Sequence, residues 1–189
     1  MAIVINGSGT VTGLAVGGLP DGTVDAGTLA TDSVTAAKLE ASAITGADLP
    51  TGSVLQVVQA TGNAVTNPNT SYADVAGSSI AITPSSSSSR VLFTVNAGGM
   101  SNGANSAIFI QILRGSTVIR ECERYGYASV GWAACPIFLN YIDSPNTTSA
   151  VTYKVQAKTA EDADFRIGDQ DGSSNGSNGI VVTATEIAG

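Results

Sequence analysis

Side chains that could carry covalent or metal chemistry are few in this sequence. The chain contains no His, which removes Ser-His and Cys-His nucleophilic sites and the commonest metal ligand. Its two cysteines, Cys122 and Cys135, are too few for a structural zinc site, and no Gly-rich phosphate loop with a following Lys occurs. We therefore predict no catalytic residues, no metal site and no cofactor, and we expect that the protein is not an enzyme.

Acidic side chains leave two further possibilities open. A pair of carboxylates could in principle hydrolyse a glycan, although chance proximity is expected among 15 Asp and Glu residues. The cluster Asp162, Asp164, Asp169 and Asp171 could hold a hard cation such as Ca²⁺ through oxygen ligands. Because the cluster lacks the full spacing of a helix-loop-helix calcium site, a solvated acidic loop is the better interpretation.

The segment 121–132 offers the best candidate for non-covalent binding. Arg124, Tyr125, Tyr127 and Trp132 crowd together there beside flexible Gly residues, in a region that we expect between strands. Exposed aromatic side chains next to hydrogen-bonding groups are what a sugar-binding or protein-binding surface requires. We predict these four as contact residues for a partner. The alternative is that the aromatic residues pack in the core or at a seam between subunits, since Trp is usually largely buried.

Composition shows where a core can form and which partners are excluded. Every Phe, Tyr and Trp lies after residue 70, so we expect the core in the C-terminal two-thirds. The net charge is −7, and Lys38 is the only basic residue before residue 71. Since no Lys and Arg cluster exists, we expect no nucleic acid partner, and an anionic membrane surface is disfavoured for the same reason.

The start of the sequence indicates where the protein is made. It has neither a basic leader nor a long apolar run, and no stretch predicts insertion into a membrane. We expect synthesis in a reducing cytoplasm. Two buried free thiols are therefore the better prediction for Cys122 and Cys135, with a disulfide across a hairpin as the alternative.

A repeat of ten residues precedes the aromatic part of the chain. The segments 21–30, 31–40 and 41–50 align without gaps. Apolar residues recur at positions four and nine of each unit, namely Val24, Leu29, Val34, Leu39, Ile44 and Leu49. The frame continues forwards to Val54, which fills the first apolar position of the next unit.

Each decad predicts one short helical turn that ends on its leucine. The Asp or Thr after the β-branched residue is a helix N-cap, and Thr45 with Asp48 has the spacing of a capping box. An isolated turn is too short to be stable in water, and two apolar residues per decad cannot form a monomeric core. We infer that several copies of the chain wind together and share these layers. The alternative is a flexible linker, which has no reason to keep apolar residues in register.

From residue 51 onward, short β-strand patterns alternate with turn residues. Leu113 to Val118 reads as a tight hairpin around Arg-Gly-Ser. The absence of a helical period predicts an all-β fold, an antiparallel β-sandwich of the jelly-roll type. The predicted strands are Ser53–Ala60, Tyr72–Val75, Ser79–Thr83, Arg90–Ala97, Ala107–Arg114, Thr117–Glu123, Pro136–Ile142, Ala150–Lys158, Asp164–Ile167 and Ile180–Ile187. We therefore divide the chain into an N-terminal attachment segment and repeat (1–50, the stalk) and a β-sandwich (51–189, the head).

The sequence resembles tail fibre proteins of marine and freshwater bacteriophages. The decads, with units such as DSVTAAKLE, are similar to the repeats of these fibres. The head resembles a small C-terminal domain at the ends of such fibres, through stretches such as GSVLQVV (52–58), ITP followed by the serine run 85–89, and LRGST (113–117). Further stretches that carry the resemblance are YIDSP (141–145), SAVTYKVQ (149–156) and the closing TEIAG (185–189).

This resemblance implies a virion component that is a homotrimer, with a jelly-roll-like head exposed for adsorption to a glycan or protein of the host surface. The partner-contact residues of segment 121–132 would then be receptor-binding residues, and the N-terminus would bind baseplate, tail or capsid proteins. The alternative function is a capsid-attached fibre or decoration protein that stabilises the virion without binding a receptor.

Overall fold

The computed structural model describes residues 24, 29, 31–40, 43–62, 69–102, 106–126, 132–134, 136–159, 164–168 and 179–189. The chain divides into two compact units, Met1–Ile44 and Thr45–Gly189, so the last turn of the repeat belongs to the same unit as the head. Within the described ranges, the regular elements are β-strands and two short 3₁₀ turns, and none of the helical turns there is long and apolar enough to cross a membrane.

In the units 31–40 and 41–50, which the structure describes over most of their length, the decad repeat closes one short turn per unit, as predicted. The 3₁₀ turns η1 (Ala36–Lys38) and η2 (Gly46–Asp48) each directly precede the leucine of position nine. In η2, the carboxylate of Asp48 accepts hydrogen bonds from the backbone N–H of Thr45 at 2.8 Å and from its hydroxyl at 2.7 Å. These bonds lower the pKa of Asp48, and they are the interaction that the Thr45–Asp48 spacing predicts.

Every strand predicted from the sequence is present, with bounds that are identical for Arg90–Ala97, Asp164–Ile167 and Ile180–Ile187 and differ by at most three residues for the others. Two strands, β5 and β8, were not predicted. The strands are β1 (Val54–Gly62), β2 (Ala73–Asp74), β3 (Ile80–Ile82), β4 (Arg90–Ala97), β5 (Gly99–Asn102), β6 (Ser106–Arg114), β7 (Thr117–Gly126), β8 (Trp132–Ala134), β9 (Ile137–Asp143), β10 (Val151–Thr159), β11 (Asp164–Ile167) and β12 (Ile180–Ile187).

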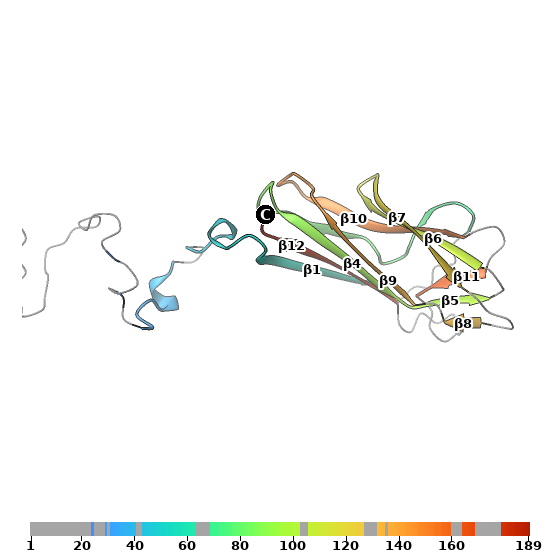
Figure 1. The fold of residues 1–189 in the computed structure, drawn as a ribbon, viewed down its shortest axis with the longest axis horizontal. Coiled ribbons are helices and arrows are strands. Elements are labelled where there is room, and N and C mark those ends of the chain that lie inside the picture. Colours follow the sequence, from blue (N-terminus) through green and yellow to red (C-terminus); the bar gives the residue numbers. More distant parts are fainter. Residues whose placement is uncertain are drawn as a thin grey trace, which may run out of the picture. The chain divides into compact units, whose positions relative to one another are not determined.

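The strands of the head form two main sheets that pack face to face (Figure 1). One sheet has the order β1-β12-β4-β9, and the other has the order β2-β10-β6-β7 with β3 also paired to β10. All described pairings are antiparallel. A small third sheet, β11-β5-β8, lies at the end of the head opposite the C-terminus (Figure 1).

The strand order of the two main sheets is that of a jelly roll. If β2 and β3 are counted as one position and the small sheet is set aside, the first sheet holds the first, eighth, third and sixth strands. The second sheet holds the second, seventh, fourth and fifth strands. This order follows when a long antiparallel pair folds over on itself, as in double-sheet jelly rolls. The predicted fold class of the head is therefore confirmed.

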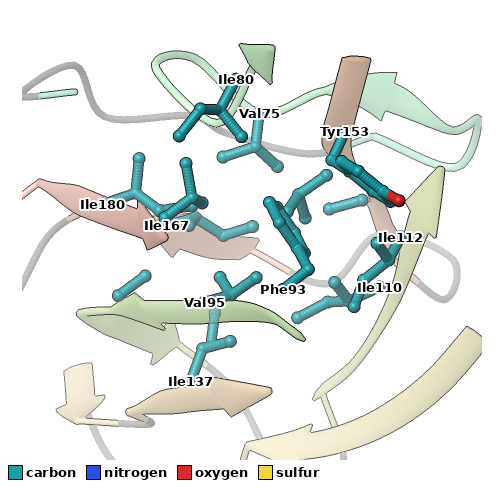
Figure 2. Close-up of a cluster of buried hydrophobic side chains, with 14 of the residues drawn as sticks. Val75, Ile80, Phe93, Val95, Ile110, Ile112, Ile137, Tyr153, Ile167 and Ile180 are labelled. Atoms are coloured by element: carbon teal, nitrogen blue, oxygen red, sulfur yellow. The ribbon is translucent and has the colours of Figure 1, made fainter. Parts of the chain in front are cut away.

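The core of the head fills the space between the two sheets. Phe93 of β4 and Tyr153 of β10 come from opposite sheets and stack with ring centroids 5.5 Å apart (Figure 2). Around them lie aliphatic side chains from both sheets, including Val95, Ile110 and Ile112 (Figure 2). The alternation of buried and outward residues along β4 places every second side chain in this core.

An ion pair between a buried carboxylate and a half-buried guanidinium joins the two sheets beside this core. Asp143, at the end of β9, binds Nη1 of Arg114, at the end of β6, at 2.8 and 3.1 Å. The Tyr153 hydroxyl donates a hydrogen bond of 2.7 Å to the same carboxylate. Burial and the neighbouring Asp143 carboxylate raise the pKa of Tyr153, so its hydroxyl stays protonated and can donate. The cluster stabilises the sandwich; it contains no exposed reactive group.

A second buried carboxylate fixes the serine run to the sheet. Glu186 of β12 is fully buried. It accepts hydrogen bonds from the backbone N–H and the hydroxyl of Ser85, each at 2.7 Å, and from the side-chain amide of Gln56. Burial raises the pKa of Glu186, but the hydrogen bonds outweigh burial and the pKa lies below its usual value. Glu186 is therefore buried as an anion.

Candidate functional site

Three of the predicted receptor-binding residues, Arg124, Tyr125 and Trp132, lie on strands, so the expectation that segment 121–132 lies between strands is wrong for residues 121–126 and for Trp132. Strand β7 continues to Gly126, because β6 pairs with it residue by residue as far as Ser106. Within that ladder, the backbones of Arg124 and Tyr125 pair with Ile108 and Ala107.

The remaining predicted contact residues fall elsewhere. Trp132 begins β8 and pairs with Asn102 of β5, in the small sheet at the end of the head (Figure 1). Tyr127 lies outside the described residues. The structure thus places Arg124 and Tyr125 together on one strand and assigns Trp132 to a different sheet.

A cluster that sequence reasoning missed lies on the outer face of the β2-β10-β6-β7 sheet. The ammonium group of Lys158 lies 4.7 Å from the ring centroid of Tyr72 and 5.0 Å from that of Phe109. The Tyr72 hydroxyl donates a hydrogen bond to Glu121 of β7. We call these four residues the aromatic cluster. A cation between two rings stabilises their positions without covering all of their surface.

A ladder of hydrogen bonds runs across the strands beside this cluster. The side-chain amide of Gln111 on β6 donates to Gln156 on β10 at 2.7 Å, and Gln156 donates in turn to Asp74 on β2, also at 2.7 Å. Lys154 binds the same Asp74 carboxylate at 2.9 Å. The hydrogen bonds from Lys154 and Gln156 lower the pKa of Asp74. The ladder keeps amide and carboxylate groups in a fixed arrangement on an outer face.

Aromatic rings beside fixed donors and acceptors are what recognition of a sugar or a polar protein surface requires. Phe109 is adjacent in β6 to Ile108, whose backbone pairs with Arg124, so the cluster and two of the predicted contact residues lie on neighbouring strands. The signal in the sequence is the period of two in β6, where the half-buried Phe109 lies between the core residues Ile108 and Ile110. The alternation within β6 does not predict the contact between Tyr72 and Lys158, because these residues belong to other parts of the chain.

The head also has a half-open cavity of about 440 Å³ where the chain enters β1. Its walls combine hydroxyl groups of the serine run with the apolar side chains of Leu49 and Leu55 and with Gly189. Thr45 and Gly46 of the last repeat turn also line it. The cavity contains no reactive pair of side chains among these residues, and the nearby Glu186 carboxylate is fully bonded inside the sheet.

The six predicted stalk residues are exposed in the single chain. Their exposed fractions range from 39% at Leu49 to 58% at Ile44. The others in this set are Val24, Leu29, Val34 and Leu39. No partner within one chain covers these described side chains, as the sparse spacing of the repeat requires.

Cysteine and acidic residues add no reactive centre to the part of the chain that the structure describes. Cys122 is a reduced thiol, half-buried against the core, and Cys135 lies outside the described residues. No group of three or more His, Cys, Asp or Glu side chains there could hold a metal ion. Of the acidic cluster, Asp162, Asp169 and Asp171 lie outside the described residues, and Asp164 begins β11.

No protein-family model and no curated protein matches the sequence. Similarity to solved structures is weak. The dimeric latent PorU of Porphyromonas gingivalis gives a TM-score of 0.40 at 6% identity, over 74% of this chain and 13% of that chain. The structure of the Gx strain of infectious bursal disease virus gives 0.38 at 10% identity, over 70% of this chain and 36% of the other. The VP2 subviral particle of that virus gives 0.35 at 11% identity, over 71% and 38% of the two chains.

This chain therefore spans well under two thirds of each of these proteins. With so low an identity and so partial a superposition, the likeness carries no functional argument. The function proposed below is supported by the residues of this chain.

Proposed function

We propose that this chain is a non-enzymatic structural subunit of a bacteriophage particle, a short homotrimeric fibre whose head adsorbs to the host surface. The observation that carries the proposal is the decad repeat. Its Val, Ile and Leu side chains keep a strict register and are nevertheless 39–58% exposed in one chain. Apolar side chains in register that find no cover within one chain are a feature of segments that assemble with copies of themselves.

The head supports the second half of the proposal. A jelly roll needs no partner to bury its core, so its outer surfaces are available for recognition. The aromatic cluster offers rings, a cation and fixed polar groups on one outer face. A weak site of this kind gains avidity when three copies act together, without new contacts.

Adsorption of the purified full-length protein to host cells tests the proposal. We expect the protein to bind, and we expect Phe109→Ala combined with Lys158→Ala to reduce binding by at least about tenfold. An aromatic pair contributes roughly 0.5 to 1.5 kcal/mol and a cation–π contact roughly 0.5 to 2 kcal/mol, so losing both is sufficient. Val118→Ala is the matched control, because Val118 is an exposed residue of the neighbouring strand β7 outside the cluster. Equal binding by both variants would exclude the aromatic cluster as the contact surface.

A different outcome would favour the alternative function. If the wild-type protein does not bind host cells, and particles that lack it lose their integrity, the chain is a capsid-attached fibre or decoration protein. Activity on host polysaccharide, measured with the same protein, would contradict the non-enzymatic assignment.

A further inference from the structure

The outer face of the β1-β12-β4-β9 sheet carries no charge over three consecutive rows of cross-strand pairs. The backbone register sets these rows, because neighbouring strands pair residue against residue. The rows are Val57–Thr185–Leu92–Ile142, Gln59–Thr183–Thr94–Asn140 and Thr61–Val181–Asn96–Phe138. We call this surface the neutral face.

The neutral face points away from the core. The residues that alternate with it on β4, among them Val91, Phe93 and Val95, are all buried between the sheets. Side chains of a strand alternate between its two faces, so Leu92, Thr94 and Asn96 must point outward. The face nevertheless exposes large apolar side chains at both edges of the sheet: Val57 of β1 is 60% exposed and Ile142 of β9 is 49% exposed.

The other main sheet has an outer face of the opposite character. It carries Asp74, Lys154, Lys158 and Glu121, which already bind one another or neighbouring side chains. A protein with a net charge of −7 that leaves three consecutive rows of one sheet face without charge, with Arg90 only in the row beyond them, has one surface on which identical copies can meet without repulsion. The absence of charge thus favours a second copy of this chain as the partner.

The repeat supplies the second argument. Its β-branched position recurs every ten residues at Val24, Val34 and Ile44, and the next position in that series is Val54. Val54 is the first residue of β1 and is 58% exposed, the same fraction as Ile44. Through the pair Val54–Ile187 it borders the first row of the neutral face. The apolar series of the stalk therefore continues along the chain into this face.

We propose that the neutral face is the surface through which the heads of neighbouring copies contact one another in the assembled fibre. This inference rests on the proposed homotrimer and adds to it a specific contact in the head. The contact is centred on the row of Val57, Leu92 and Ile142. The polar row of Gln, Thr and Asn lies beside it, and the third row adds Val181 and the exposed Phe138. The faces with charged residues remain outside the contact.

Sedimentation of the full-length protein over a series of concentrations tests this inference. We expect Val57→Glu and, separately, Ile142→Glu to raise the concentration at which half of the trimer dissociates by at least about tenfold, because each substitution places like charges in a dry contact. Val118→Glu is the matched control, since it adds the same charge at an exposed valine of the other sheet. We expect its dissociation to match the wild type.

Circular dichroism of each variant verifies that the sandwich is folded, and two variants on opposite edge strands guard against a local defect in one of them. A trimer that resists both glutamates as well as it resists the control would overturn the neutral face as a contact, while the trimer itself would stand. Equal weakening by all three variants would also overturn it, because the effect would then reflect total charge. A wild-type protein that stays monomeric at every concentration would instead refute the proposed homotrimer.

Discussion

Replacing Val34 and Leu39 by Asp should separate the fibre into single chains. Both side chains belong to the unit 31–40, and in the single chain they are 54% and 44% exposed. If copies wind together, each of these positions forms a layer of three equivalent side chains. The two substitutions place six carboxylates in a segment that otherwise buries only aliphatic groups, which is costly unless the segment opens to water.

The size of the effect follows from the exposed fractions. Complete burial of a Val or Leu side chain contributes about 1.5 to 3 kcal/mol, and roughly half of that remains to be gained on assembly, on the order of 1 kcal/mol per side chain. Two layers of three side chains then contribute about 6 kcal/mol to one trimer. Their loss weakens the assembly by roughly four orders of magnitude in its equilibrium constant, even before the burial of charge is counted.

Analytical ultracentrifugation at micromolar concentration is the assay, and the structure offers a close control. Thr35→Asp adds the same charge next to Val34, at a position where the preceding decad already carries Asp25. We expect Thr35→Asp to remain trimeric and the double variant to sediment as a monomer with an intact head. A double variant that remains trimeric at the wild-type concentration would show that the repeat does not hold the chains together.

Three predictions concern the stability of the head. Tyr153→Phe removes the hydroxyl that binds the buried Asp143 carboxylate, and we expect the free energy of unfolding in urea to fall by about 1 to 3 kcal/mol, with Arg114 still bound to Asp143. Phe93→Ala should cost about 3 to 5 kcal/mol, since it removes one of the two stacked rings at the centre of the core, and a loss below 1 kcal/mol would contradict that placement. The pKa of Glu186 is lowered from its usual 4.5 in the folded head, so the contribution of this carboxylate to stability is present above pH 4.5 and is lost as the pH falls through the folded pKa. Glu186→Gln should therefore lose less melting temperature in acid than the wild type. Identical pH profiles of the melting temperature would refute the assignment.

Local sequence patterns predicted most of the head because strands with one buried face carry a period of two. The bounds of Arg90–Ala97 and Ile180–Ile187 agree with β4 and β12, where apolar residues alternate with polar ones. Strand β5, with the sequence GMSN, was missed because it contains no β-branched or aromatic residue. It is a strand only because β8 and β11 pair with it on either side. Tertiary pairing of this kind leaves no local signal.

The candidate site shows the same limit. The aromatic residues of segment 121–132 are predicted as contact residues because they are close in sequence, whereas Tyr72 and Lys158 lie far apart along the chain. The pairing of β2 with β10 brings them together, and that pairing depends on the strand order of the whole sandwich. The Arg114–Asp143 ion pair has the same origin, because its two residues end strands of different sheets.

The division of charge between the two outer faces of the sandwich connects assembly with adsorption. A sheet that must contact identical copies of a chain with a net charge of −7 is better without charge, because every charge on it would be repeated in each copy. A sheet that must recognise a foreign polar surface needs fixed charges, amides and rings, and the β2-β10-β6-β7 face has all three. If the neutral face holds the heads together, the aromatic cluster points away from the contact and is presented in every copy. Substitutions in the aromatic cluster should then change adsorption without changing the trimer, and substitutions in the neutral face should change the trimer first and adsorption only through the loss of avidity.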